Sequence, residues 1–189
     1  EIKDLIDRNN FKGALINAGG PPAKSTLETE IDDWDDAYFQ LVRWKILLTR
    51  ALLPKMQKNN YGRIVYLESI SVKQPVENLV LSNSMRLAVV GFVKTLSSEI
   101  SGSGVNLNIM APGYHETAAL ERLYRKKSET EGISLEEARS QFREMIPLNR
   151  TGDTDEFASL AVWLLSPLSS YITGQTISID GGVMRHVVG

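Results

Sequence analysis

The sequence predicts a single domain of the α/β class, built on a parallel sheet. Short apolar segments bounded by glycine, such as Gly62–Leu67, alternate along the chain with longer segments that have helical periodicity. Strands separated by helices require crossover connections, and these produce a parallel sheet. A chain of 189 residues with 42% hydrophobic and 23% charged residues has the length and composition of one globular domain. We therefore expect one domain over residues 1–189.

Composition excludes several classes of function. The chain has no cysteine, so disulfides, zinc–thiolate sites and thiol nucleophiles are excluded. Its two histidines, His115 and His186, are too few for a histidine-rich metal site, and we expect no metal. The net charge of −2 and the interspersed charges do not indicate a nucleic-acid surface. Without an apolar run long enough to cross a bilayer, we expect a cytoplasmic protein with no nucleic-acid or membrane partner.

The first third of the chain contains two predicted helices and a strand. Apolar residues at helical spacing begin at Ile2, and the segment Gly13–Gly20 has the short apolar core of a buried strand that leads into a tight loop. A long helix is predicted from about Asp33 to Asn59, with Asp32 or Asp33 as its N-cap. Pro54 is expected to kink or tighten the last turns of this helix.

The rest of the chain continues the alternation of strands and helices. The charged segment Thr117–Gln141 predicts two helices separated at Gly132, with Ser134 and Glu137 as a capping box; a solvated excursion explains its charge equally well. The other predicted elements are a strand over Gly62–Leu67, a helix over Ser82–Ser101, a strand over Val105–Met110, a helix over Thr154–Leu165 and a strand over Gln175–Asp180.

Collinear motifs over nearly the whole chain resemble one known family. They are Leu15–Gly19, Trp34–Asp35, Thr49–Ala51 with Leu53–Pro54, Gly62–Val65 leading to Ser69, Val89–Phe92 with Thr95–Leu96, Ala111–Gly113 with Thr117, Tyr171–Gln175, and Ile179–Gly182. Their order and spacing resemble those of the short-chain dehydrogenases/reductases. The resemblance implies a Rossmann-type doubly wound sheet and hydride transfer between a nicotinamide and a carbonyl or alcohol group.

The same resemblance implies a longer protein. Members of the family begin with further strands that carry a glycine-rich phosphate-binding loop, and no G-x-G-x-x-G or G-x-x-x-G-x-G stretch occurs in this chain. An apolar strand such as Leu15–Ile16 at an open sheet edge would also be prone to aggregation. We therefore expect that about the first quarter of the domain is missing. The alternative is a small protein whose first strand is this one.

The family's catalytic positions carry mostly other residue types here. The resemblance places the family's asparagine at Leu41, its serine at Ser69, its tyrosine at Ser82 and its lysine at Arg86. Ser82 and Arg86 are four residues apart and are expected on one helix face. A serine hydroxyl is far less acidic than a phenol, and a guanidinium does not release a proton in proteins. We expect Ser69, Ser82 and Arg86 to form a divergent catalytic site.

Other side chains are candidates for the missing acid or base. Glu68 adjoins Ser69 at the end of a strand, where ligands bind in open α/β sheets; the alternative is a solvated surface role. Tyr114 and His115 follow the Pro-Gly loop and would face the nicotinamide in the family geometry, and His115 has a suitable pKa range. Loop histidines are nevertheless more often merely exposed. Tyr66 alternates into the core.

The cofactor-binding positions are closer to the family pattern. The resemblance places Asn17, Ala18 and Gly19 beside the adenine ribose, where small residues permit close approach of the backbone. Arg86 would bond the nicotinamide ribose. The loop of Pro112, Gly113 and Thr117 would frame the carboxamide. The resemblance implies NAD or NADP as the cofactor. The sequence does not distinguish between the two, because the strand that carries the selecting residue is not in this sequence.

Three functions remain open from the sequence. The first is an NAD(P)-dependent oxidoreductase with a small-molecule substrate, the second a non-catalytic relative that binds a dinucleotide, and the third a purely structural partner. Apolar stripes on the helices Trp34–Asn59 and Ser82–Ser101 resemble the family's subunit interfaces. They predict a homodimer or homotetramer.

Overall fold

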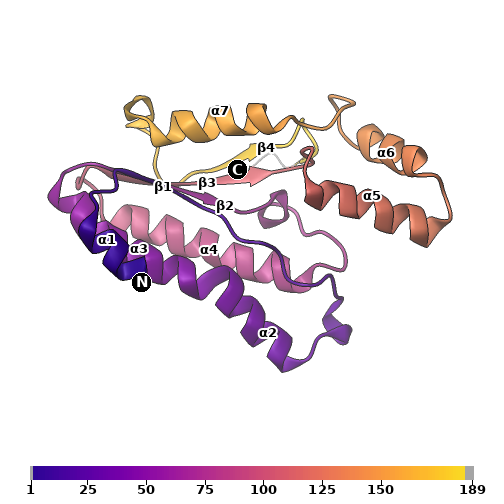
Figure 1. The fold of residues 1–189 in the computed structure, drawn as a ribbon, viewed down its shortest axis with the longest axis horizontal. Helices are drawn as coiled ribbons and strands as arrows, with labels where there is room; N and C mark the ends of the chain where they lie inside the picture. Colours follow the sequence, from indigo (N-terminus) through magenta and orange to yellow (C-terminus); the bar gives the residue numbers. More distant parts are fainter. Residues whose placement is uncertain (1, 186–189) are drawn as a thin grey trace.

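The computed structural model describes residues 2–185, and the side chains of residues 4–185 (Figure 1). Its sheet contains β1 (Gly13–Ile16), β2 (Gly62–Leu67), β3 (Val105–Pro112) and β4 (Thr176–Ile179), hydrogen-bonded in the order β1-β2-β3-β4 with all neighbours parallel. The register pairs Ile16 with Tyr66 and Tyr66 with Ile109. The carboxyl ends of the strands therefore form one common edge, and the predicted α/β class is confirmed.

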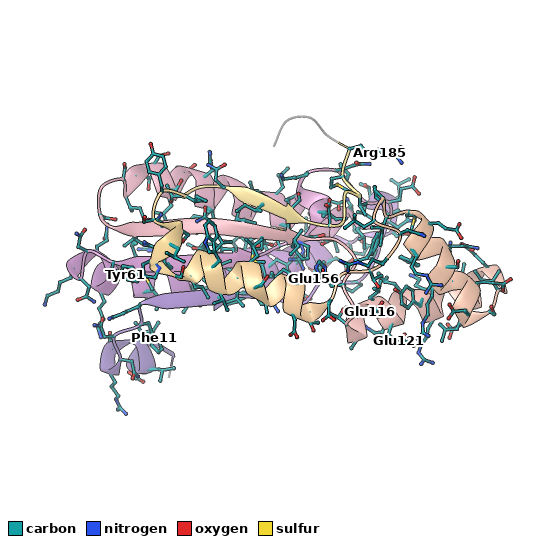
Figure 2. All side chains as sticks on the ribbon, turned by 90° about the horizontal axis from the view of Figure 1, so that it is seen from above. Phe11, Tyr61, Glu116, Glu121, Glu156 and Arg185 are labelled. Atoms are coloured by element: carbon teal, nitrogen blue, oxygen red, sulfur yellow. The ribbon has the colours of Figure 1, made fainter. Side chains whose placement is uncertain are left out.

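Helices cover both faces of this sheet. Figure 1 shows α1 (Ile2–Arg8), α2 (Ile31–Tyr38), α3 (Trp44–Lys58) and α4 (Val80–Glu99) on one face, and α7 (Thr154–Leu165) on the other. Helices α5 (Ala118–Glu131) and α6 (Leu135–Glu144) extend beyond the end of β3. Figure 2, viewed from above, shows Tyr61 and Glu156 near opposite ends of α7. No described helix combines the length and hydropathy needed to cross a membrane.

Alternation along the strands divides the core between these two faces. Ile64 and Tyr66 of β2 join the large cluster that packs against α3 and α4, whereas Val65 joins a smaller cluster with Leu164 of α7. This is the period of two that a pleated strand imposes on its side chains. Within β1, Ile16 is buried in the large cluster but Leu15 is 47% exposed. The expectation that both residues are buried is therefore wrong for Leu15 in the described structure.

The long predicted helix is a composite of three segments. It begins with α2, whose N-cap is Glu30 and not Asp32 or Asp33; the Glu30 N–H donates to Asp33 Oδ2 at 2.9 Å. A π-helical turn, η2 (Phe39–Arg43), joins α2 to α3. Pro54 lies inside α3, which continues to Lys58. The helix is therefore irregular at the π-turn, and it does not end at the proline. Turns of this kind often occur at functional sites.

The charged segment after β3 folds into a helical pair with its own core. Gly132 ends α5 with a φ of 67°, a conformation that favours glycine. The predicted capping box of Ser134 and Glu137 begins α6. Between the two helices lies an apolar cluster of Leu120, Tyr124 and Phe142. The two predicted helices are confirmed.

Three short 3₁₀ turns complete the described part of the chain, residues 2–185. They are η1 (Thr26–Glu28), η3 (Ile70–Val72) and η4 (Pro167–Ser169). Of these, η3 directly follows the end of β2 and leads towards α4. It therefore borders the carboxyl edge of the sheet.

Candidate functional site

Polar residues from two strand ends and one helix meet at the carboxyl edge of the sheet. Gly19 lies in the loop after β1, Glu68 follows β2, and Ser82 and Arg86 lie in the first two turns of α4. Arg86 Nε donates to Ser82 Oγ at 3.1 Å. The four-residue spacing therefore places both side chains on one face of the helix, as expected from the sequence.

Arg86 joins these elements through its guanidinium group. Nη1 donates to Glu68 Oε2 at 3.1 Å and to the Glu68 carbonyl at 3.3 Å. Nη2 donates to the Gly19 carbonyl at 3.2 Å. One buried side chain thus connects α4 to the end of β2 and to the loop after β1.

Glu68 is buried and paired, which contradicts the alternative of a solvated surface role. Lys45 Nζ, from the first turn of α3, lies 2.5 Å from Glu68 Oε1, and neither side chain is exposed. Burial raises the pKa of Glu68 and lowers the pKa of Lys45, although each charge opposes the shift of the other. Because the Glu68 carboxylate does not reach solvent, it is badly placed to accept a proton from a substrate.

Lys45 was missed by the sequence reasoning, although a signal was present. Lysine rarely occupies a fully buried position unless it is paired. Lys45 lies four residues after Leu41, and Leu41 and Val42 are buried in the π-turn. A lysine on the apolar face of this helix could have indicated a buried partner. The carboxylate that pairs with it is distant in sequence and is brought near by the fold.

Ser69 and Leu41, to which the resemblance assigns the family's serine and asparagine, make different kinds of contact. Ser69 caps η3, where its Oγ accepts a hydrogen bond from the Ser71 N–H at 3.2 Å. Its side chain is half-buried. Leu41 is fully buried in the large core cluster. Ser69 therefore has a capping role that does not depend on catalysis.

The loop of Asn17, Ala18 and Gly19 is open on the surface. Asn17 and Gly19 are exposed, whereas Ala18 is half-buried against the core. Apart from its two chain neighbours, no described residue lies within 4 Å of the position that a Cβ on Gly19 would take. The backbone of this loop is accessible to a ligand, as close approach of a ribose requires.

The Pro-Gly loop has local roles as well. Pro112 is the last residue of β3, and the Gly113 N–H donates to the Ile179 carbonyl at 3.0 Å. A Cβ on Gly113 would lie 2.8 Å from the Cβ of Asp180, so a glycine is required by packing. Thr117 is the N-cap of α5 and accepts a hydrogen bond from the Leu120 N–H at 3.3 Å.

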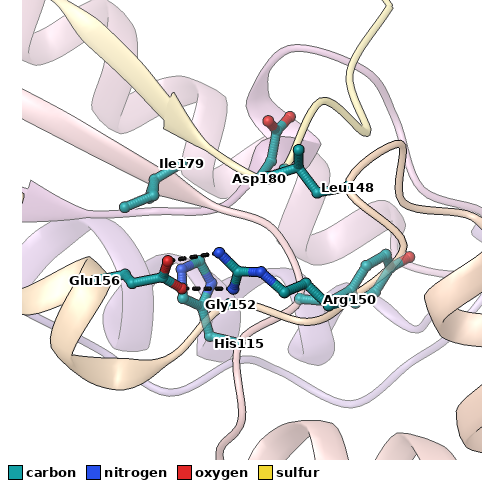
Figure 3. Close-up of a pocket in the computed structure, with 9 residues that line it drawn as sticks. His115, Leu148, Arg150, Gly152, Glu156, Ile179 and Asp180 are labelled. Atoms are coloured by element: carbon teal, nitrogen blue, oxygen red, sulfur yellow. Dashed lines mark hydrogen bonds and ion pairs between the residues drawn. The ribbon is translucent and has the colours of Figure 1, made fainter.

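A cavity of about 180 Å³ borders Tyr114 and His115, which directly follow this loop (Figure 3). Two oxygens of Glu156 accept hydrogen bonds from the two Nη groups of Arg150 at 2.6 and 2.8 Å. The lining residues are Tyr114, His115, Leu148, Arg150, Gly152, Glu156, Ile179, Asp180 and Gly181. None of them is Ser69, Ser82 or Arg86. This cavity is therefore separate from the cluster around Arg86.

The candidate acids near the Pro-Gly loop and on β2 are packed side chains. His115 is buried, and its ring lies edge-on to Phe157 at 5.6 Å, so it is not the exposed loop histidine of the alternative. Burial raises the pKa of Tyr114, whose ring packs edge-on against Phe142 at 5.2 Å. Tyr66 is fully buried as expected, and burial raises its pKa. The two tyrosines are less acidic than a free phenol.

Comparison with known proteins identifies the family. A family model described as enoyl-(acyl carrier protein) reductase matches residues 6–184. The chain is 31% identical over 183 residues to a 3-oxoacyl-[acyl-carrier-protein] reductase of Aquifex aeolicus, covering 97% of this chain and 68% of that protein. It is 32% identical over 176 residues to the NADPH-dependent reductase BacG of Bacillus subtilis, covering 92% and 67%. It spans 55% of dehydrogenase/reductase SDR family member 4 of Bos taurus, at 30% identity over 163 residues.

Solved structures agree with this relationship. The chain superposes on YwfH, an NADPH-dependent reductase involved in bacilysin biosynthesis, with a TM-score of 0.93, 26% identity and coverage of 98% of this chain and 72% of the other. An NADPH-bound short-chain oxidoreductase from Pseudomonas aeruginosa, described as containing an atypical catalytic center, gives a TM-score of 0.85 at 25% identity, with coverage of 98% and 72%. The chain belongs to the short-chain dehydrogenase/reductase family, whose members are NAD(P)-dependent oxidoreductases.

Proposed function

We propose that this protein is an NAD(P)-dependent oxidoreductase that transfers a hydride between a nicotinamide and a small-molecule carbonyl or alcohol. The observation that carries the proposal is the contact of Arg86 with both Ser82 and Gly19 at the carboxyl edge of the sheet. In open α/β folds, dinucleotides bind at this edge. Two of the similar proteins, BacG and YwfH, are named as NADPH-dependent reductases.

The residues present fit a dinucleotide on one side of the site. The accessible backbone of Asn17, Ala18 and Gly19 permits a ribose to approach, and Arg86 supplies a fixed positive charge and hydrogen-bond donors beside it. When bound, the cofactor supplies or accepts the hydride. We assign Pro112, Gly113 and Thr117 to the nicotinamide side by the family resemblance, in addition to their structural roles.

On the substrate side, we propose that hydroxyl groups orient the reacting oxygen. Ser69 would donate a hydrogen bond to the substrate oxygen. Ser82 already accepts a hydrogen bond from Arg86, which leaves its own proton free to be donated. The adjacent guanidinium would stabilise negative charge that develops on the substrate oxygen. Since serine is a weak acid, proton transfer here is expected to be slower than with a phenol.

A second candidate is a relative that binds a dinucleotide without turnover. It is favoured by the burial of Lys45, Glu68 and Tyr66, because no solvent-accessible atom of these three groups is available to exchange a proton with a substrate. A purely structural role is the third candidate. Binding and turnover measurements separate the three.

The test is a titration of the protein with NADH and NADPH. Binding is followed through the fluorescence of Trp34, Trp44 and Trp163 and through energy transfer to the reduced cofactor. Saturable binding followed by turnover of a carbonyl substrate supports the oxidoreductase, and Arg86→Met and Ser69→Ala should then each lower kcat/KM at least tenfold. Binding without turnover supports the second candidate. Absence of binding at millimolar cofactor would mean that the dinucleotide pocket of this chain is truncated or abandoned, and neither candidate would then hold for the chain by itself.

We further propose that residues 1–189 form one domain, that the protein is cytoplasmic, and that it assembles as a homodimer or homotetramer. Since the chain has no cysteine, its fold does not require an oxidising compartment for disulfides. The large exposed side chains of Phe39 and Leu47 on η2 and α3, and of Leu87 on α4, support an interface on these helices.

A further inference from the structure

Lys45, Glu68 and Arg86 form a buried ion triad that connects three elements of the fold. Glu68 contacts Lys45 with one carboxylate oxygen, at 2.5 Å, and Arg86 with the other, at 3.1 Å. The side chains of Lys45, Glu68 and Arg86 are 0%, 0% and 9% exposed. They come from α3, from the residue after β2 and from α4. Each cation therefore has its own acceptor on the single carboxylate.

Burying three charged groups in the core of a protein is energetically unfavourable. Removing charges from water costs several kcal/mol for each ion, and well-packed apolar residues in place of a buried ion pair are often equally stable or more stable. The triad also carries two positive charges and one negative charge. The raised pKa of Glu68 and the lowered pKa of Lys45 have the same cause, since desolvation opposes both charged forms. Fold stability alone therefore does not account for the three residues.

The triad fixes the orientation of the Arg86 guanidinium. It does not provide a path for proton transfer. A continuous series of hydrogen bonds runs from Lys45 through Glu68 and Arg86 to Ser82. A proton moving along it would have to pass through the guanidinium of Arg86, which does not deprotonate in proteins. The guanidinium is instead planar and rigid, so a carboxylate that holds one edge determines where the other edge points. That other edge bonds the Gly19 carbonyl.

We infer that Glu68 and Lys45 are positioning residues: Glu68 orients Arg86 so that it holds the Asn17–Gly19 loop and Ser82, and Lys45 provides the second charge that stabilises Glu68 in its buried place. The functional consequence rests on the proposed function, because it is the dinucleotide that this loop and Arg86 would bind. The effect on the loop itself can be measured without any cofactor.

The charges predict a distinct order among three variants. Glu68→Gln leaves two buried cations without their carboxylate, and should be the least stable. Lys45→Met leaves a neutral pair of Glu68 and Arg86, in which Arg86 keeps its orientation. The double variant Lys45→Met/Glu68→Gln removes the repulsion between the cations but does not restore the orientation of Arg86.

Three measurements on the unliganded and NADPH-titrated protein test the inference. The backbone order parameters of residues 17–20, from ¹⁵N relaxation, should fall by about 0.2 in Glu68→Gln and in the double variant, and should change little in Lys45→Met. The midpoint of thermal unfolding should be lowest in Glu68→Gln and should partly recover in the double variant. NADPH affinity should follow the order parameters, with at least a tenfold loss in both variants that lack Glu68. Glu131→Gln, which removes an exposed ion pair to Lys127, is the matched control and should leave all three readouts unchanged.

The inference is overturned if the double variant restores both stability and the order of the loop, because Glu68 would then act through stability alone. It is also overturned if the order parameters of residues 17–20 are the same in Glu68→Gln as in the wild type. A wild-type protein that binds neither NADPH nor NADH would end the proposed function but not this inference, which the order parameters of the unliganded protein decide.

Discussion

The candidate site depends on the number of hydrogen-bond partners that one arginine side chain can contact at the same time. Arg86 bonds Ser82, Glu68 and Gly19 through its Nε, Nη1 and Nη2 groups. A lysine at this position would present a single ammonium on a flexible stem, and could not hold three partners in a fixed planar arrangement. The residue type at position 86 therefore determines how the loop after β1 is attached to α4.

At Gly113, the residue type is determined by the space that is available to a side chain. A Cβ there would lie 2.8 and 2.9 Å from the Cβ and Cα of Asp180. Gly113→Ala should therefore lower the free energy of unfolding by about 1–3 kcal/mol, as overpacking does. Gly91→Ala is the control, because Gly91 lies inside α4 and, apart from its chain neighbours and the backbone of its own helix, no described atom lies within 4 Å of its Cβ position. Gly91→Ala should raise the free energy of unfolding by about 0.5–1 kcal/mol.

Urea denaturation of the two glycine variants measures both values. Equal stability of Gly113→Ala and the wild type would contradict the close approach of the Pro-Gly loop to Asp180.

At the scale of elements, α7 begins in a network of local charges. Asp153 is its N-cap and forms a capping box with Glu156, whose carboxylate also accepts two hydrogen bonds from Arg150. These contacts anchor the start of α7 to the loop before it, beside the cavity of Figure 3. They satisfy N–H groups that the first turn of a helix otherwise leaves without partners.

Glu156 gives this region a predicted pH dependence. Hydrogen bonds from Arg150 and from the Asp153 N–H lower the pKa of Glu156 from 4.5 to about 2. Since the folded pKa lies below the unfolded value, the carboxylate stabilises the fold above pH 4.5, and this contribution is lost as the pH falls towards 2. Glu156→Gln should therefore be less stable than the wild type at pH 7, and the difference should shrink at pH 3. Guanidinium chloride denaturation at both pH values checks this; an unchanged difference would assign the effect to packing.

At the scale of the whole molecule, apolar side chains remain exposed on the helical face formed by η2, α3 and α4. Phe39, Leu47 and Leu87 are each about half exposed, at 51%, 49% and 53%. Contiguous exposed apolar patches mark interaction surfaces in soluble proteins, and these three side chains lie on elements of one face of the sheet. This is the surface on which we propose that copies of the chain meet.

Substitution on that surface should change the mass of the particle. Leu47→Glu combined with Leu87→Glu should convert the assembly to a smaller species, because a carboxylate in an apolar interface is not solvated. Leu27→Glu is the control, since Leu27 is 98% exposed and belongs to η1, which is not one of the proposed interface elements. Light scattering after size exclusion reports the mass. An unchanged mass in the double variant, or an equal effect of Leu27→Glu, would place the interface elsewhere.

The local elements of this protein could be predicted from its sequence because their signals are local. The strand Gly62–Leu67 and the helix Thr154–Leu165 have the predicted boundaries, and the capping box of Ser134 and Glu137 is confirmed. The spacing of Ser82 and Arg86 was sufficient to place them together, since the helix period alone determines it. The collinear motifs likewise identified the family.

Other features were decided only by tertiary structure. The π-turn at Phe39–Arg43 depends on packing that periodicity does not encode, and the burial of Glu68 depends on Lys45, 23 residues away in the sequence. A charged residue at a strand end can be solvated or paired, and only the fold determines which partners lie within reach. The sequence by itself therefore determined the fold and the residues near the site. The tertiary structure decided that one buried carboxylate holds two cations there, because long-range ion pairs form between elements that the folded chain brings together.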